Sequence, residues 1–473
     1  MRMRLFLALL LMVPAAGQAG VRPRYGGTLR VLLPARPAEP HPSRAETFAE
    51  LLAVRATGET LLEVDSLGRL APALLEAVPE LEDGGRTVRL RLAPALAFHD
   101  GEPLTAARVA ESLENLGAPG SPNAFLLAPI VGAAAVHAGA TRSFAGIEVL
   151  SERELKIDLA YPFPDFPAVL ATLPSAIVHQ TPRGAEDGAG PFVAVDEGAQ
   201  GLVLEPFEGF HGGRPFADEV VLRGSEGRLT SRTFPAGEAE LVVRAELLAS
   251  ATPVELPRRG LVLAVVSRRL AGAESIYGAL RALDRADLAR FVRAPASPVA
   301  SLLSPAGPSS PAAADPPPEK LPARLRVLLP AAPDSPRGVA ARLQVKLYDR
   351  GVRVALESVA KDGLSARLYA GDFEAAIVPL WLYSHRPALV LAQVAAAVGG
   401  YDAGARFLRE AAEADEAHLA PLAAALEREL LVVPLYAYGL RVGVAEGVAG
   451  LALHDDGTLD LGGTWLLPMR SGP

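Results

Sequence analysis

The segment Arg86–Gly117, RTVRLRLAPALAFHDGEPLTAARVAESLENLG, decides the fold prediction. Apolar residues alternate with arginines in its first third, and this period of two predicts a half-buried β-strand. Asp-Gly and Pro within residues 100–103 predict a tight turn. Thr105 is placed to cap a helix with apolar residues at i, i+4 and i+7, and Gly117 is predicted as the residue that stops it. The segment is therefore expected to form a strand, a turn and an amphipathic helix.

The composition is that of a folded soluble protein. The chain has 473 residues, of which 50% are hydrophobic and 21% charged, and this length is ample for two or three packed domains. A net charge of −8 argues against nucleic-acid binding. There is no cysteine, so the chain has no disulfide and no cysteine for a lipid anchor.

Residues 1–19 have the pattern of a signal peptide. Arg2 and Arg4 form a positively charged start, an apolar run follows over Leu5–Val13, and small residues lead to a cleavage point predicted near Ala19. The apolar run is too short to span a bilayer, and no later segment is expected to cross one. We therefore expect an exported, periplasmic protein that is monomeric and not membrane-spanning.

The sequence of the Arg86–Gly117 segment resembles that of the bacterial extracellular solute-binding proteins of family 5, the oligopeptide, dipeptide and nickel receptors. Phe98–Gly101, followed by Pro103–Ala106 and Val109, matches the strand–turn–helix pattern of that family. Gly188–Phe192 resembles its GTGPY hinge motif, with Ala for Thr and Phe for Tyr. Further matches, among them Tyr369–Ile377, extend the resemblance over nearly all of the chain after the signal peptide.

The resemblance implies an α/β fold, namely the two-lobed periplasmic-binding-protein fold of type II with a mixed sheet in each lobe. It also implies an extra small domain inserted in the first lobe. The expected parts are the signal peptide (1–19), lobe I (20–62, 176–258 and 440–473), the inserted domain (63–175) and lobe II (259–439), the last with a Pro/Ala-rich loop at 294–322.

Receptors of this family bind their ligand between two lobes that close about a hinge. By resemblance, ligand contacts come from the stretch that begins with a tryptophan in lobe II, from the hinge motif, and from the loop after the first strand. Trp and Tyr suit such a site and Arg can fork onto a carboxylate, although ordinary packing between lobes explains the aromatic residues equally well. The candidate ligand-binding residues are Trp381, Tyr383, Ser384, His385, Arg386, Gly190, Phe192 and Glu39.

One departure from the family bears on the ligand. Peptide receptors of this family commonly place an aspartate just after this tryptophan, where it pairs with the ligand's α-amino group. The matching stretch here reads SHRP over Ser384–Pro387 and has no carboxylate. The sequence therefore leaves a peptide, an anionic, a neutral or an altered ligand open.

The resemblance implies a receptor that hands a short peptide or peptide-like solute to the permease subunits of an ABC transporter, with no cofactor and no catalysis. A degenerate receptor that serves as a sensor or an accessory subunit is the alternative, given the missing carboxylate and the short chain. A secreted serine acyl-transfer enzyme is represented only by the S-x-x-K string of Ser358 and Lys361. The chain has no K-T-G motif to accompany it.

The eight histidines do not predict a metal site. None is paired with another at i+4, and no cluster with metal-ligand spacing is visible in the sequence. His99 is assigned to the turn motif and His211 to a hairpin motif of the family. No metal is expected.

Overall fold

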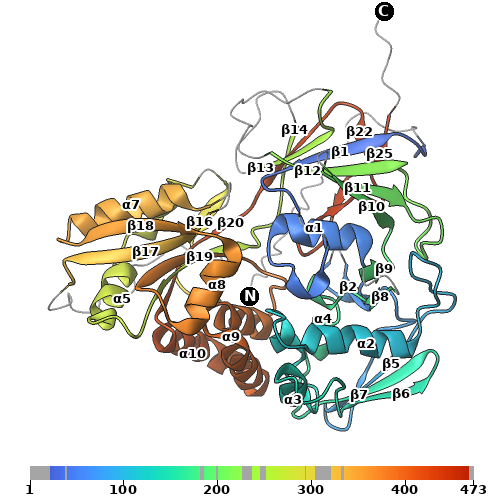
Figure 1. Cartoon of the computed structure of the whole chain (residues 1–473), viewed down its shortest axis with the longest axis horizontal. Helices are drawn as coiled ribbons and strands as arrows, with labels where there is room; N and C mark the ends of the chain where they lie inside the picture. Colours follow the sequence, from blue (N-terminus) through green and yellow to red (C-terminus); the bar gives the residue numbers. More distant parts are fainter. Residues whose placement is uncertain are drawn as a thin grey trace, which may run out of the picture.

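Two mixed β-sheets form the centres of two lobes in the computed structural model, one on each side of the molecule in Figure 1. The structure describes residues 22–467, apart from 38–39, 66, 182–185, 199–200, 226–236, 245–251, 293, 304–320 and 332–334. The predicted signal peptide and the candidate residue Glu39 lie outside the described residues.

A seven-stranded sheet is the centre of the first lobe. Its strand β1 (Thr28–Leu33) pairs in parallel with β12 and β13, and every other pairing in the sheet is antiparallel. Every second residue of β1 is buried, as a strand with one face on a core requires. The other strands in spatial order are β10 (Phe192–Gly198), β11 (Gly201–Pro206), β12 (Glu219–Gly224), then beyond β1 β13 (Leu241–Arg244), β21 (Arg441–Val444) and β14 (Thr252–Glu255).

A six-stranded sheet is the centre of the second lobe. Its strand β15 (Gly260–Val266) is buried along its whole length, as the unbroken apolar run GLVLAVV predicts for a strand covered on both faces. Alternate residues from Leu261 pack into the core shared with the first lobe, and those from Val262 pack into a second core. The spatial order is β16 (Ala296–Pro298), β20 (Val432–Tyr438), β15, β19 (Ala375–Trp381), β17 (Arg324–Pro330) and β18 (Arg353–Val359).

The short strand β16 corrects the prediction of an unbroken loop at 294–322. Its three residues pair antiparallel with β20 although they lie in a Pro-rich stretch. The strand forms because β16 is at the edge of the sheet, where proline is tolerated. Residues 304–320 of the predicted loop lie outside the described residues.

The segment Arg86–Gly117 folds as predicted in its strand, its turn and the start of its helix. The strand is β5 (Thr87–Arg91) and the helix is α2 (Ala106–Gly117), whose cap Thr105 accepts a hydrogen bond from the Arg108 N–H. The prediction of Gly117 as the stop beyond the helix was wrong, because it is the last helical residue. Its lack of a side chain makes room for Phe144, whose ring would lie 2.5 Å from a Cβ at this position.

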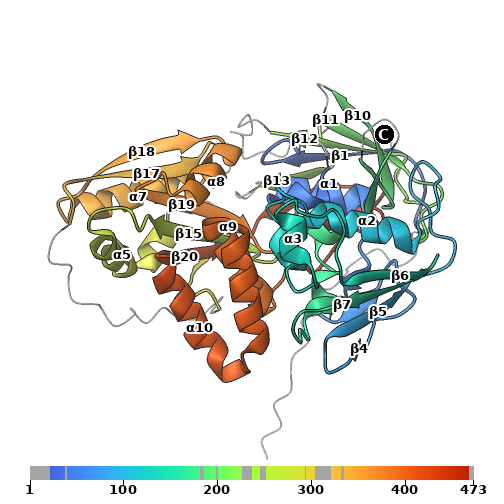
Figure 2. The same cartoon turned by 60° about the horizontal axis from the view of Figure 1, so that its bottom comes forward.

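A four-stranded antiparallel sheet accompanies α2, and Figure 2 shows it on the side of the first lobe. All of its strands fall within residues 63–175, the predicted inserted domain, whose exact boundaries stay a prediction. The sheet order is β4 (Leu81–Glu82), β5, β7 (Glu154–Asp158) and β6 (Ile147–Ser151); the helices of this region are α2, α3 (Ala133–His137), α4 (Phe166–Val169) and the 3-10 helices η2 (Ala124–Leu127) and η3 (Leu173–Ser175).

Two chain segments cross between the lobes and run side by side. One joins β14 to β15 and the other joins β20 to β21. The Leu256 N–H donates to the Leu440 oxygen across a distance of 2.9 Å. A Cβ at Gly439 would lie only 2.7 Å from the Leu256 oxygen, so the close approach requires glycine. The second lobe is therefore one continuous insertion between two strands that are neighbours in the sheet of the first lobe.

The remaining helices line and cover the sheets. The first lobe contributes η1 (Pro42–Arg44) and α1 (Phe48–Thr57), and the second contributes α5 (Ala273–Arg281), α6 (Arg285–Ala289), α7 (Arg337–Tyr348), α8 (Lys361–Ala370), α9 (Pro387–Glu413) and α10 (Glu416–Glu429). Short strand pairs complete the chain, namely β2 (Leu62–Val64) with β3 (Leu70–Pro72), β8 (Val178–Gln180) with β9 (Glu186–Gly188), β22 (Val448–Ala449) with β25 (Trp465–Leu466), and β23 (Ala452–Leu453) with β24 (Leu459–Asp460).

Among the described residues, α9 alone is long and apolar enough to cross a membrane by length and composition, where the sequence reading expected no such segment. Its length arises because two helical stretches join across Gly400, whose φ of 75° and ψ of −169° are not helical. In its most apolar stretch, 61% of the residues are buried inside the protein. These properties are those of a kinked core helix.

Candidate functional site

A cavity lies between the two lobes, with walls from the first lobe, the inserted region and the second lobe. Its volume is about 150 Å³, which is space for on the order of ten water molecules. The start of α1 and residues near η2 form one wall. Helix α8, the end of β19 and the first part of α9 form the opposite wall. A small solute held here would touch all three regions.

Aromatic rings form much of the apolar wall. Trp381, at the end of β19, packs edge-on against Phe48 of α1 with ring centroids 5.1 Å apart. On its other side it faces the Tyr438 ring at 6.1 Å. The Trp381 indole N–H donates to the Asp456 backbone oxygen at 3.1 Å. The tryptophan therefore lines the cavity and also joins the lobes. Its contact with a ligand stays a prediction.

Tyr383 joins all three regions through one hydroxyl group. This oxygen lies 2.8 Å from Asn123 Oδ1 and 3.1 Å from the Ala45 backbone oxygen. Both partners are acceptors, so the hydroxyl must keep its proton, and burial raises its pKa well above the ordinary value. Gln393 fixes the backbone of the same stretch, donating to the Trp381 oxygen at 2.8 Å and accepting from the Tyr383 N–H at 3.2 Å.

The charged side chains that line the cavity, within the part of the chain that the structure describes, are Glu46 and Lys361. The Lys361 ammonium is shared between two carboxylates of the first lobe. It lies 3.2 Å from Glu46 Oε2 and 2.8 and 2.9 Å from the two oxygens of Glu50. These contacts join the second lobe to the first by an ion pair beside the cavity.

Neither helix that contributes to this ion pair requires it for its own local structure, so the pair serves the contact between the lobes. Lys361 is the first residue of α8, and a cation at a helix N-terminus is opposed by the helix dipole. Glu50 completes a capping box with Thr47 at the start of α1, where its Oε2 accepts from the Thr47 N–H at 2.9 Å. One carboxylate therefore both caps a helix of the first lobe and binds the lysine of the second.

Of the predicted ligand residues that the structure describes, Trp381 and Tyr383 line the cavity and the others do not. Ser384 accepts a hydrogen bond from the Arg386 N–H, and Arg386 itself pairs with Asp165 of the inserted region at 2.6 Å. His385 is 56% exposed and faces Asp455 and Arg259 on the other side of the stretch. These three residues contact protein groups outside the lining.

The predicted hinge residues also lie away from the cavity lining. A Cβ at Gly190 would be 2.6 Å from the Gly58 oxygen, because this segment packs tightly on the end of α1. Phe192 is fully buried in the core of the first lobe. The segments that cross between the lobes are those near Leu256 and Leu440, so glycines at 188–190 provide close packing within the first lobe.

The S-x-x-K string does not form an acid–base pair in the structure. Ser358 Oγ accepts from the Arg337 guanidinium, whereas the Lys361 ammonium is bound by two carboxylates. Burial acts to lower the pKa of Lys361, but Glu46 and Glu50 outweigh it and raise that pKa. A lysine that serves as a base needs the opposite shift. This geometry gives no support to acyl transfer.

Sequence reasoning missed the residues that come from distant segments. Glu46 and Asn123 lie far from Lys361 in the chain, and no local pattern connects them. The capping box Thr47-x-x-Glu50 was a usable signal for the start of α1. It predicts a helix there and not a contact with the other lobe.

Residues 69–256 match the family model described as bacterial extracellular solute-binding proteins, family 5 Middle. This segment belongs to family 5. It contains the strand–turn–helix stretch and the Gly188–Phe192 motif on which the resemblance was based, and the resemblance is confirmed. No curated protein matches the sequence.

Solved structures similar to this chain confirm the fold as that of the type II periplasmic binding proteins. The Escherichia coli murein tripeptide binding protein MppA is 17% identical, with a TM-score of 0.76 over 93% of this chain and 98% of that chain. Haemophilus influenzae OppA in complex with RPPGFSPFR is 14% identical, with a TM-score of 0.76 over 94% and 100%. AgaA from A. tumefaciens R10 in complex with agropinic acid is 17% identical, with a TM-score of 0.74 over 94% and 99%.

A second MppA structure distinguishes lobe arrangements. Its unliganded open form is 16% identical and gives a TM-score of 0.59 over 93% of this chain and 97% of that one. The other MppA structure gives 0.76 over the same share of this chain, so the present lobe arrangement superposes better on that structure than on the open form. The short distances across the cavity agree with this arrangement.

Proposed function

We propose that this chain is the solute-binding receptor of an ABC importer and that it encloses a short peptide or peptide-like solute by closure of its two lobes. The observation that carries the proposal is the cavity walled by both lobes and bordered by the Lys361 ion pair. The family 5 segment and the shared fold support it. Export to the periplasm and delivery to permease subunits belong to the same proposal.

The lining favours a solute with a mainly apolar body and a few hydrogen-bonding groups. Phe48, Trp381 and Leu368 offer apolar contact area. Ser335 also lines the cavity, and its buried Oγ makes no hydrogen bond within the described part of the chain. A short peptide with an apolar side chain has this combination of groups.

Native mass spectrometry of the protein from a periplasmic extract, with identification of what co-purifies, tests the proposal. We expect short peptides. A single non-peptide compound would keep the receptor role and replace the solute. An empty cavity with no thermal-shift response to peptide pools would contradict the importer role and favour the degenerate receptor.

A matched pair of tryptophan variants locates the binding site. Trp381→Leu should weaken binding of the identified solute by about tenfold, because a buried aromatic anchor of a pocket contributes roughly 1–2 kcal/mol or more. Trp465→Leu removes the other tryptophan, which is also buried, in β25, but does not line the cavity, and should leave affinity unchanged. Calorimetric titration of both variants is the measurement, and equal losses would place the solute elsewhere.

Peptide charge gives a further test. Among the described residues, the carboxylate that lines the cavity is that of Glu46, and it is already bound to Lys361. Peptides with a free N-terminus should therefore bind within about threefold of their N-acetylated forms, which is under 1 kcal/mol. A strong preference for the free amine in calorimetry would show that Glu46 leaves the lysine to bind the ligand.

A further inference from the structure

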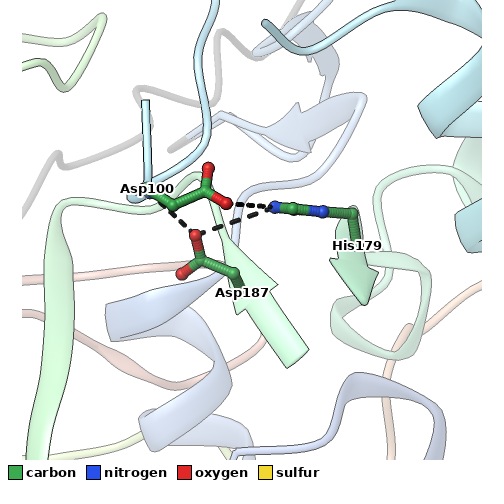
Figure 3. A group of neighbouring side chains, drawn as sticks. All are labelled: Asp100, His179 and Asp187. Atoms are coloured by element: carbon green, nitrogen blue, oxygen red, sulfur yellow. Dashed lines mark hydrogen bonds and ion pairs between the residues drawn. The ribbon is translucent and has the colours of Figure 1, made fainter. Parts of the chain in front are cut away.

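A second polar cluster lies outside the cavity, where the turn of the inserted region meets the β8–β9 hairpin. Figure 3 shows Asp100 from the turn, His179 from β8 and Asp187 from β9 pointing toward one another. One ligand atom from each lies within 4.8 Å of the others, and no other group of three or more such residues occurs in the described part of the chain. The three side chains come from segments that the sequence separates by up to 87 positions.

His179 is a buried base without a hydrogen bond. The residue is 1% exposed, and neither of its ring nitrogens makes a hydrogen bond within the described residues. Its Nε2 points between the two carboxylates, 3.2 Å from Asp100 Oδ2 and 3.8 Å from Asp187 Oδ2. A buried polar atom in this state costs stability, so a group that the nitrogen and both oxygens could bind together would relieve it.

Both carboxylates are held in place by other contacts. Asp187 Oδ1 lies 3.2 Å from His99 Nδ1, and its Oδ2 accepts from the Asp100 N–H at 2.8 Å. Asp100 Oδ1 accepts from the Glu102 N–H at 2.9 Å, which leaves Oδ2 directed toward His179. Carboxylates that bind metals are fixed by supporting hydrogen bonds of this kind.

We propose that Asp100, His179 and Asp187 bind a divalent transition-metal ion, with Zn²⁺ as the best fit. Tetrahedral Zn²⁺ with bonds of 2.0–2.2 Å places neighbouring ligand atoms about 3.3–3.6 Å apart, and the nitrogen-to-oxygen distances of 3.2 and 3.8 Å bracket that value. An imidazole nitrogen in the set favours Zn²⁺ over Ca²⁺ and Mg²⁺, which take oxygen ligands. Water would supply the fourth ligand.

The ion would join the turn to the hairpin within one lobe. Its position is separate from the cavity between the lobes, because none of the three residues lines that cavity. The His99 N–H already donates to the Gly188 oxygen at 2.9 Å, so the two segments are adjacent without a metal. We therefore expect the ion to raise thermal stability and to leave solute affinity unchanged.

Calorimetric titration with ZnCl₂ and elemental analysis of untagged, chelator-treated protein test the site. The wild type should bind one equivalent of Zn²⁺, and Asp100→Asn, Asp187→Asn and His179→Gln should each lose at least tenfold in affinity. His418→Asn is the matched control, because its ring pairs at 2.6 Å with Asp415 in an exposed two-residue pair that an adventitious ion could use. The control should bind as the wild type does.

The change in melting temperature on addition of Zn²⁺ tests the site even if a substitution lowers the stability of a variant. Zn²⁺ should raise the melting temperature of the wild type and the control, but not of Asp100→Asn, whose side chain has the same shape. Circular dichroism without metal checks that each variant is folded. Binding of less than one equivalent by the wild type, or equal affinity in the wild type and both Asp→Asn variants, would overturn the proposal and indicate an adventitious ion only.

Discussion

Two clusters in this molecule each place a side-chain nitrogen between two carboxylates, and they differ in how well the nitrogen is bound. Beside the cavity, the Lys361 nitrogen lies between the carboxylates of Glu46 and Glu50. In the first lobe, the His179 nitrogen lies between the carboxylates of Asp100 and Asp187. The lysine contacts both carboxylates within 3.2 Å, whereas the histidine makes no hydrogen bond to any group in the described part of the chain.

The difference follows from the geometry of the two nitrogens. An ammonium has three hydrogens that point in different directions and can serve two carboxylates at once. An imidazole Nε2 has one lone pair or one hydrogen, in the plane of the ring. Two oxygens around such a nitrogen are more than it can bind by hydrogen bonds, and a metal ion accommodates all three. Among the described residues, the cavity cluster is complete with protein groups alone, and the His179 cluster is not.

Removal of the Glu50 side chain should have the largest effect, because it breaks two interactions at once. Glu50→Ala loses the capping box of α1 and the ion pair with Lys361, and should lower the free energy of unfolding by about 1–2 kcal/mol. Glu50→Gln keeps a capping acceptor and should lose only the part due to the charge. Urea unfolding of the two variants is the measurement, and equal losses would show that the cap contributes nothing.

Loss of the lysine should act on closure more than on folding. Lys361→Met should weaken solute binding about fivefold, since a partly exposed ion pair is worth up to about 1 kcal/mol. Lys346→Met removes a lysine that pairs with Asp287 inside the second lobe and should leave affinity unchanged. If calorimetry shows the same affinity for both variants, the ion pair beside the cavity has no part in closure.

The pH dependence of closure tests the same pair from both sides. Burial acts to raise the pKa of Glu50, but Lys361 and the backbone hydrogen bonds outweigh it, so the pKa lies below the ordinary 4.5. The contribution of the ionised Glu50 to the closed arrangement is therefore complete above pH 4.5 and is lost as pH falls through the lowered value. The pKa of Lys361 is raised above the ordinary 10.5, so its contribution is complete below pH 10.5 and is lost as pH rises through the raised value. Solute affinity should therefore be level between these limits, and a slope near pH 7 would contradict the assignment.

The smallest effect on stability should come from Asp100→Asn in metal-free protein. Unlike the Glu50 variants, it should not lower the free energy of unfolding. The asparagine keeps the turn acceptor for the Glu102 N–H and can turn its NH₂ group toward the His179 nitrogen. We expect the free energy of unfolding to stay the same or to rise by up to about 1 kcal/mol. A clear loss of stability by urea unfolding without metal would mean that the Asp100 carboxylate is already well paired with protein groups.

The parts of this fold that were predictable depend on neighbouring residues. The strand, the turn and the Thr105 cap of the Arg86–Gly117 segment follow from periodicity and side-chain capping, which act within a few residues. Gly117 was misread because its role is set by Phe144, which approaches from a separate segment. The same glycine signal serves a helix stop or a close contact, and only the packing decides between them.

The candidate sites show the same limit. Trp381 and Tyr383, which line the cavity, were candidates because they stand in one short stretch that the family resemblance marks. The pairing of Lys361 with Glu50 joins residues 311 positions apart, and the cluster of Asp100 with His179 and Asp187 joins a turn to a later hairpin. Histidine spacing along the sequence carries no information about such a contact, so no metal ligand set was predicted.

The path of the chain between the lobes fixes the order in which the molecule can be assembled. Strand β21 lies between β13 and β14 and, among the described strands, is the one sheet neighbour of β14, yet residues 260–438 precede it in the chain. During synthesis from the N-terminus, the sheet of the first lobe therefore has an unpaired edge at β13 until nearly all of the chain has emerged. A nascent chain that stops before Arg441 would expose that edge to other strands, so the last stretch of sequence protects the first lobe from aggregation.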